Sequence, residues 1–134
     1  MKDQMNIILV DDNDIDIVVN TKLLKLANIT DNIVSFNRCE NALDWLAENH
    51  AQGGFKDNVI LLDIQMPGTD GFQCLEKYTQ LSEEVKISCR VFMLSSSIDR
   101  GDIERSEANV DVIKVLEKPL DVYLFKRLLA AESL

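Results

Sequence analysis

The chain has 134 residues, of which 46% are hydrophobic and 28% are charged, with a formal net charge of −9 at pH 7. This length and composition predict one globular domain, large enough for a hydrophobic core. The acidic charge, without a Lys or Arg cluster, argues against nucleic acid as a direct partner, and no stretch approaches the roughly 18 apolar residues of a membrane span.

The first four residues run straight into a strand-like segment, 5–10, and leave no room for a signal peptide, so we expect a cytoplasmic protein. Acidic residues 11–14 follow at once, and an amphipathic helix comes next. Helical spacing predicts a buried stripe on this helix made of Ile15, Val19, Leu23 and Leu26. The side predicted to face solvent carries Asp16, Asn20 and Lys22. Asn28 marks the end of the helix.

A short second strand is predicted at 33–36, and a second amphipathic helix runs from Cys39 to about Asn49. The loop after it, 50–57, contains Gly53-Gly54. The three cysteines, Cys39, Cys74 and Cys89, match neither a zinc spacing nor a disulfide framework, and we interpret them as small buried side chains.

The central strand, 58–63, is an uninterrupted apolar run that ends in Asp63, as expected for a strand buried on both faces. Pro67-Gly68 terminates it, and Thr69-Asp70 offers caps for a third helix over 71–81. Residues 82–88 are polar and are expected to be irregular.

The fourth strand, 90–94, ends in three serines, of which Ser95 follows the apolar run directly. A weak surface helix is expected within 99–109, then a fifth strand at 112–116 followed by Glu117-Lys118-Pro119. Asp121 caps the predicted last helix.

Five strands that alternate with five helices predict the α/β class: a flavodoxin-like, doubly wound, five-stranded parallel sheet in the order 2-1-3-4-5. We expect a single domain over 1–134.

Polar residues follow four of these strands, and the carboxyl ends of parallel strands share one edge of the sheet. They are Asp11 and Asp12 after the first strand, Asp63 after the third, Ser95 after the fourth and Lys118 after the fifth. Each has a simpler interpretation as a helix cap, a turn residue or a surface lysine. Four such coincidences are improbable together, which favours one joint site.

Clustered carboxylates repel one another unless a cation neutralises them, and an all-oxygen site with few protein ligands suits Mg²⁺. The backbone carbonyl of Gln65 can add a ligand. With the ion held mainly by Asp12, Asp63 is free to act as a nucleophile that forms an acyl phosphate. Ser95 and Lys118 can then neutralise oxygens of the transferred phosphoryl group.

Over nearly its whole length the sequence resembles the receiver domains of two-component response regulators. The resemblance is carried by Ile8-Leu9-Val10-Asp11-Asp12, by the run from Leu61 through Asp63 to Gly71, by Ser95, and by Glu117-Lys118-Pro119-Leu120. It implies that Asp63 accepts phosphate from a sensor histidine kinase or a histidine phosphotransfer protein. It also implies Mg²⁺ binding at Asp11, Asp12, Asp63 and the Gln65 carbonyl, a switch role for Ser95, a phosphate contact for Lys118, and a cis Lys118–Pro119 bond.

One residue departs from the family pattern, which has an aromatic side chain three positions before the lysine, where this chain has Val115. The sequence predicts a stand-alone receiver without an output domain and with an unknown downstream protein, and a signalling domain rather than an enzyme. The alternatives are a receiver-like interaction module that is never phosphorylated and a flavodoxin-like domain that binds a flavin or nucleotide. A Mg²⁺-dependent phosphatase is disfavoured because Gln65 stands where those enzymes carry a second acid.

Overall fold

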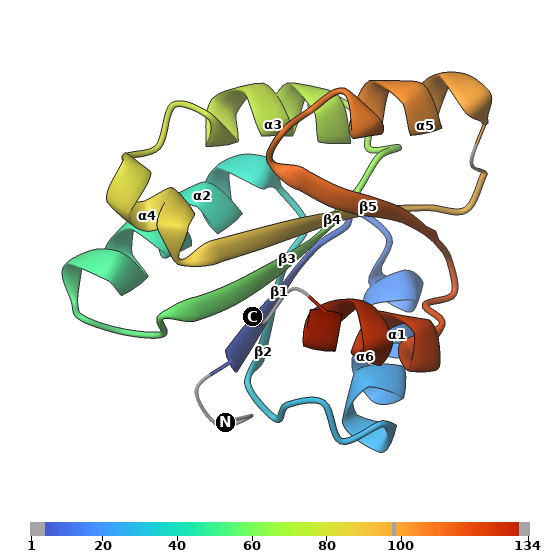
Figure 1. Cartoon of the computed structure of the whole chain (residues 1–134), viewed down its shortest axis with the longest axis horizontal. Coiled ribbons are helices and arrows are strands. Elements are labelled where there is room, and N and C mark those ends of the chain that lie inside the picture. The colour runs from blue at the N-terminus through green and yellow to red at the C-terminus, as the bar shows by residue number, and fades with distance from the viewer. Residues whose placement is uncertain (1–4, 98, 132–134) are drawn as a thin grey trace.

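The computed structural model describes residues 5–97 and 99–131, so the four N-terminal residues interpreted above lie outside its description. Its centre is a parallel five-stranded sheet in the order β2-β1-β3-β4-β5, which confirms the predicted order (Figure 1). The strands are β1 (Met5–Val10), β2 (Ile33–Phe36), β3 (Asp57–Asp63), β4 (Cys89–Ser95) and β5 (Val112–Glu117). The helices are α1 (Asp14–Leu26), α2 (Cys39–Ala51), α3 (Gly71–Tyr78), α4 (Glu83–Ile87), α5 (Arg100–Glu107) and α6 (Val122–Ala131).

Successive strand residues face opposite sides of the sheet and build two separate cores. Ile8 and Val10 point toward α2, α3 and α4, whereas Ile7 and Leu9 point toward α1 and α6. This two-sided burial explains the continuous apolar strands, since each buried large apolar side chain contributes about 1.5–3 kcal/mol. Among the described residues, no helix is both long and apolar enough to cross a bilayer.

A sixth helix corrects the expectation that residues 82–88 are irregular. The Ser82 side chain accepts a hydrogen bond from the Val85 backbone N–H and begins α4. Val85 is buried in the core while its neighbours are polar. A helix of five residues offers a single inward position, so its sequence shows no apolar periodicity.

The orientation of α1 also differs from the prediction. Ile15 and Leu26, assigned to the buried stripe, are 73% and 84% exposed, whereas Asn20 and Leu24 are buried. The helix turns its Asp16–Asn20 side inward, toward the segment that follows β5. Its N-cap is Asn13, whose side chain accepts hydrogen bonds from the backbone of Ile15 and Asp16. As predicted, the helix ends before Asn28, which has a left-handed backbone.

Two of the three cysteines form a disulfide, which corrects the expectation that their spacing matches no disulfide framework; these two are buried as expected, whereas Cys89 is only partly buried. Cys39 at the start of α2 is bonded to Cys74 in α3, with Cα atoms 5.8 Å apart. Both side chains are buried, and Cys89 is free. The bond joins the helices that follow β2 and β3, the two strands on either side of β1, and cysteine spacing along the chain does not encode this proximity.

We predict that reducing this bond lowers the free energy of unfolding by about 2–4 kcal/mol, because the bond closes a long loop in the unfolded chain. Urea unfolding with and without dithiothreitol measures the difference. Cys89→Ala serves as the control and should keep the full effect of the reductant. Equal stability in both buffers, or loss of the effect in Cys89→Ala, would contradict the prediction.

Candidate functional site

The carboxyl edge of the sheet gathers three aspartates. Asp11 follows β1 and Asp63 ends β3, and their side chains are buried, whereas Asp12 is exposed at the rim. One carboxylate oxygen from each lies within 4.8 Å of the others. The structure therefore brings together the three acids that the strand ends predicted.

The turn after Asp63 is held close to the strand by a glycine. The Gly71 N–H donates to the Ile64 carbonyl over 2.9 Å, and a Cβ at residue 71 would lie 2.6 Å from the Asp63 carbonyl oxygen. Only glycine permits this approach of α3 to the end of β3. As expected for a cap, the Asp70 carboxylate accepts the Gln73 N–H in a capping box at the start of α3.

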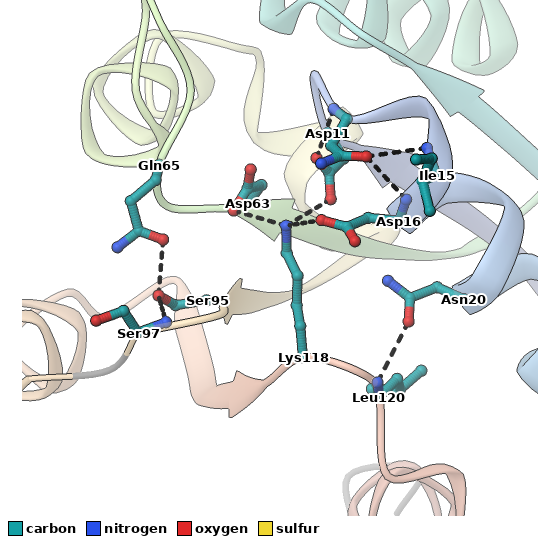
Figure 2. Close-up of polar contacts among 11 residues, drawn as sticks. Asp11, Ile15, Asp16, Asn20, Asp63, Gln65, Ser95, Ser97, Lys118 and Leu120 are labelled. Carbon is teal, nitrogen blue, oxygen red and sulfur yellow. Dashed lines mark hydrogen bonds and ion pairs between the residues drawn. The ribbon is translucent and has the colours of Figure 1, made fainter.

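Lys118 reaches into the acidic cluster from the segment after β5 (Figure 2). Its Nζ lies 2.8 Å from Asp11 Oδ2, 2.9 Å from Asp16 Oδ2 and 3.2 Å from Asp63 Oδ1. The lysine side chain is only 8% exposed, and the Lys118–Pro119 bond is cis, as the resemblance implied. The ammonium partly neutralises carboxylates that would otherwise repel one another.

The electrostatics of this cluster follow from burial and charge. The pKa of Asp63 is raised to about 6, chiefly because burial penalises the charged carboxylate, then because Asp11 lies beside it, against the opposing effect of Lys118. Burial alone lowers the pKa of Lys118, but the hydrogen bonds and charges of Asp11 and Asp16, with the charge of Asp63, outweigh it and raise that pKa above its ordinary value. Near neutral pH, Lys118 is therefore protonated and Asp63 is largely ionised.

Ser95 is fully buried at the end of β4, and its hydroxyl points to Gln65 (Figure 2). Ser95 Oγ donates to Gln65 Oε1 over 2.7 Å and accepts from the Ser97 backbone N–H over 3.1 Å. The backbone N–H of Lys118, just after β5, donates a hydrogen bond to the Ser95 carbonyl and so connects β5 to the end of β4. The Gln65 side chain thus engages the predicted switch hydroxyl, while metal ligation by its backbone carbonyl stays a prediction.

Val115, the position without the usual aromatic residue, is partly buried on β5. It lines a surface hollow of about 270 Å³ between β5 and α5, together with Ile103 and Ser106.

The sequence interpretation missed Asp16, which it assigned to the solvent side of α1. Its carboxylate contacts Lys118, and one turn later Asn20 Oδ1 accepts the Leu120 N–H over 3.2 Å. The available signal was the second stripe of α1, where Ile17 and Leu24 share a side with these two polar residues.

The acidic cluster fits a hard cation. Asp11 Oδ2 and Asp63 Oδ1 are buried, and the Lys118 ammonium beside them offsets only part of the negative charge of the cluster. Buried carboxylate oxygens with unused capacity, next to the exposed carboxylate of Asp12, form the all-oxygen donor set that Mg²⁺ prefers. Asp11, Asp12 and Asp63 could therefore hold a metal ion.

A doubly wound parallel sheet with an acidic cluster and a buried lysine at its carboxyl edge defines the class of α/β domain to which this chain belongs. The comparison with known families makes this assignment specific. Residues 7–130 match the response regulator receiver domain, and the chain belongs to this family.

Individual similar proteins agree with the family assignment. A response regulator receiver protein from Dyadobacter fermentans is 40% identical, with a TM-score of 0.88 and coverage of 95% of this chain and 96% of that one. The Mn²⁺-bound form of response regulator Rcp1 is 26% identical, with a TM-score of 0.66 and coverage of 95% and 91%. The hybrid signal transduction histidine kinase L of Dictyostelium discoideum is 29% identical over 94% of this chain, which spans only 7% of that protein's length.

Proposed function

We propose that this chain is the phosphoacceptor of a two-component phosphorelay, with Asp63 as the residue that receives the phosphoryl group. The observation that carries the proposal is the position of Asp63, buried at the end of β3 with Lys118 Nζ 3.2 Å from its Oδ1 and two further carboxylates beside it. A carboxylate in this setting is a nucleophile with a cation ready for the incoming charge.

The proposed step transfers a phosphoryl group from the phosphohistidine of a sensor histidine kinase or a histidine phosphotransfer protein. An oxygen of Asp63 forms a bond to phosphorus as the bond from phosphorus to the histidine nitrogen breaks. The imidazole leaves and takes up a proton, and Asp63 becomes an acyl phosphate. Lys118 neutralises part of the charge on the phosphoryl oxygens.

We further propose Mg²⁺ as the bound metal, held by Asp11, Asp12 and Asp63 with the Gln65 carbonyl as an added ligand. When bound, Mg²⁺ supplies positive charge for the phosphoryl oxygens and offsets the repulsion among the aspartates. Rcp1, a similar response regulator, has been solved in a Mn²⁺-bound form, which supports a divalent cation here.

Ser95 links this chemistry to a response. Its hydroxyl is bonded to Gln65 and must break that bond before it can donate to a phosphoryl oxygen. This movement would alter the end of β4 and the segment leading to α5, and so change a surface recognised by a downstream protein. The chain then serves as a signalling domain that loses its own phosphoryl group by hydrolysis, with no separate substrate.

The first test is phosphorylation by acetyl phosphate, an acyl phosphate donor, followed by intact-mass measurement. We expect one phosphoryl adduct in the presence of Mg²⁺, none in EDTA, and recovery when Mg²⁺ is restored in excess. The reason is that the cation offsets the negative charge of the three aspartates and of the incoming phosphoryl group. Circular dichroism in EDTA controls for unfolding. Equal labelling with and without the metal would contradict the metal-dependent mechanism, and no labelling under any condition would contradict the proposed function.

A further inference from the structure

Helix α1 holds the segment that carries Lys118 at two points, one helical turn apart (Figure 2). The Asp16 carboxylate contacts Lys118 Nζ over 2.9 Å, and Asn20 Oδ1 accepts the Leu120 N–H. Residues four apart project from the same side of a helix, so both contacts follow from one orientation of α1. Asn20 fixes the backbone of the segment, and Asp16 fixes the end of the lysine side chain.

The three carboxylates around the ammonium are not equivalent. Lys118 Nζ contacts one oxygen of each, at 2.8 Å for Asp11, 2.9 Å for Asp16 and 3.2 Å for Asp63, but Asp11 and Asp63 belong to the cluster that could hold a metal ion. Asp16, by contrast, does not belong to that metal-binding cluster. Its side chain is 33% exposed, compared with 4% for Asp11 and 3% for Asp63.

We propose that Asp16 is a positioning residue that anchors the Lys118 ammonium and so leaves Asp11 and Asp63 available for the cation and the phosphoryl group. This inference rests on the proposed function of Asp63. Once a cation occupies Asp11, Asp12 and Asp63, the ammonium loses two of its partners and is repelled by the new charge. Asp16 remains as its partner and keeps the long, flexible lysine side chain beside Asp63 instead of releasing it to solvent.

The test compares Asp16→Asn, Asp16→Glu and Asp14→Asn with the wild type. Asp14 is a matched control because both acids lie in the first turn of α1, so both variants lose the same favourable charge near the helix N-terminus. Asp14 is exposed and does not contact Lys118 in any described interaction. Asp16→Asn keeps the size of the side chain and removes only its charge.

Two readouts separate positioning from a general loss of stability. The first is the rate of Asp63 phosphorylation by acetyl phosphate at saturating Mg²⁺, which should fall about five- to tenfold in Asp16→Asn, as expected for one partly exposed charge-assisted hydrogen bond. The second is labelling of the Lys118 amine by a small acylating reagent in the Mg²⁺-loaded, unphosphorylated protein, mapped by peptide mass spectrometry. It should be several-fold faster in Asp16→Asn. Asp16→Glu should recover part of both effects, and Asp14→Asn should behave as the wild type.

The outcomes are distinguishable from failure of the proposed function. If the wild type itself gains no phosphoryl group, the proposed role of Asp63 is wrong. If the wild type is phosphorylated and Asp16→Asn matches it in rate and in Lys118 labelling, only the positioning role is wrong. Equal effects of Asp14→Asn and Asp16→Asn would also overturn it, because the cause would then be the charge at the helix end.

Discussion

Replacing Asp63 with asparagine should abolish the phosphoryl adduct formed from acetyl phosphate and Mg²⁺, while the protein stays folded. Asparagine has nearly the same shape, but its amide has no anionic oxygen to attack phosphorus. The substitution also removes one of the repelling charges at the carboxyl edge, so we expect no loss of stability. Intact-mass measurement gives the adduct, and urea unfolding gives the stability.

Asp31→Asn is a suitable control for this experiment. Asp31 is exposed and precedes β2, at the opposite edge of the sheet from the acidic cluster, so this variant should be labelled as the wild type is. Peptide mapping of the labelled wild type should locate the group on Asp63. An adduct of unchanged yield in Asp63→Asn, or one mapped to another residue of the wild type, would refute the assignment.

The strand-end residues could be predicted because they depend on regular structure alone. Continuous apolar runs identify strands buried on both faces, and the parallel topology places their carboxyl ends at one edge. Asp63 and Lys118 come from strands that are not neighbours in the sheet, yet they lie 3.2 Å apart because both leave it at that edge. The strand order and the meeting of the acids with the lysine were therefore available from the sequence.

The side of α1 that packs against the rest of the domain could not be predicted in the same way. This helix has apolar residues around most of its circumference, so two stripes compete, and the stripe that contains Ile15 is the more apolar of the two. The structure instead buries Asn20, whose amide oxygen accepts the Leu120 N–H. A polar side chain is favourable there because a backbone N–H needs a partner, a requirement that only the tertiary structure shows.

The bond between Cys39 and Cys74 depends on the same kind of non-local information. It joins the first turn of α2 to α3, and these helices meet only because β2 and β3 both flank β1 and their helices cover one face of the sheet. The number and spacing of cysteines in the sequence do not predict such a contact.

Replacing Lys118 with methionine should have opposite effects on two properties of the site: slower phosphorylation and tighter Mg²⁺ binding. Methionine keeps much of the length of the side chain and removes its charge. Because the ammonium lies 2.8 Å from Asp11 and 3.2 Å from Asp63, it competes for the same oxygens that a cation would use. Removing the ammonium makes the potential at the metal site more negative, which favours a bound cation. It also leaves the phosphoryl oxygens without one of their neutralising charges.

The same substitution should lower the free energy of unfolding in EDTA by about 2 kcal/mol, less than the usual cost of breaking a buried ion pair, because Asp63 takes up a proton instead of remaining charged. Added Mg²⁺ should then stabilise Lys118→Met more than the wild type, since only the variant lacks an internal cation for its buried acids. Lys114→Met provides the control, because Lys114 is exposed on β5, four residues before Lys118, and this variant should match the wild type in all three measurements. Weaker Mg²⁺ binding together with slower phosphorylation in Lys118→Met would show that the lysine supports the metal site instead of competing with it, contrary to the arrangement of charges found here.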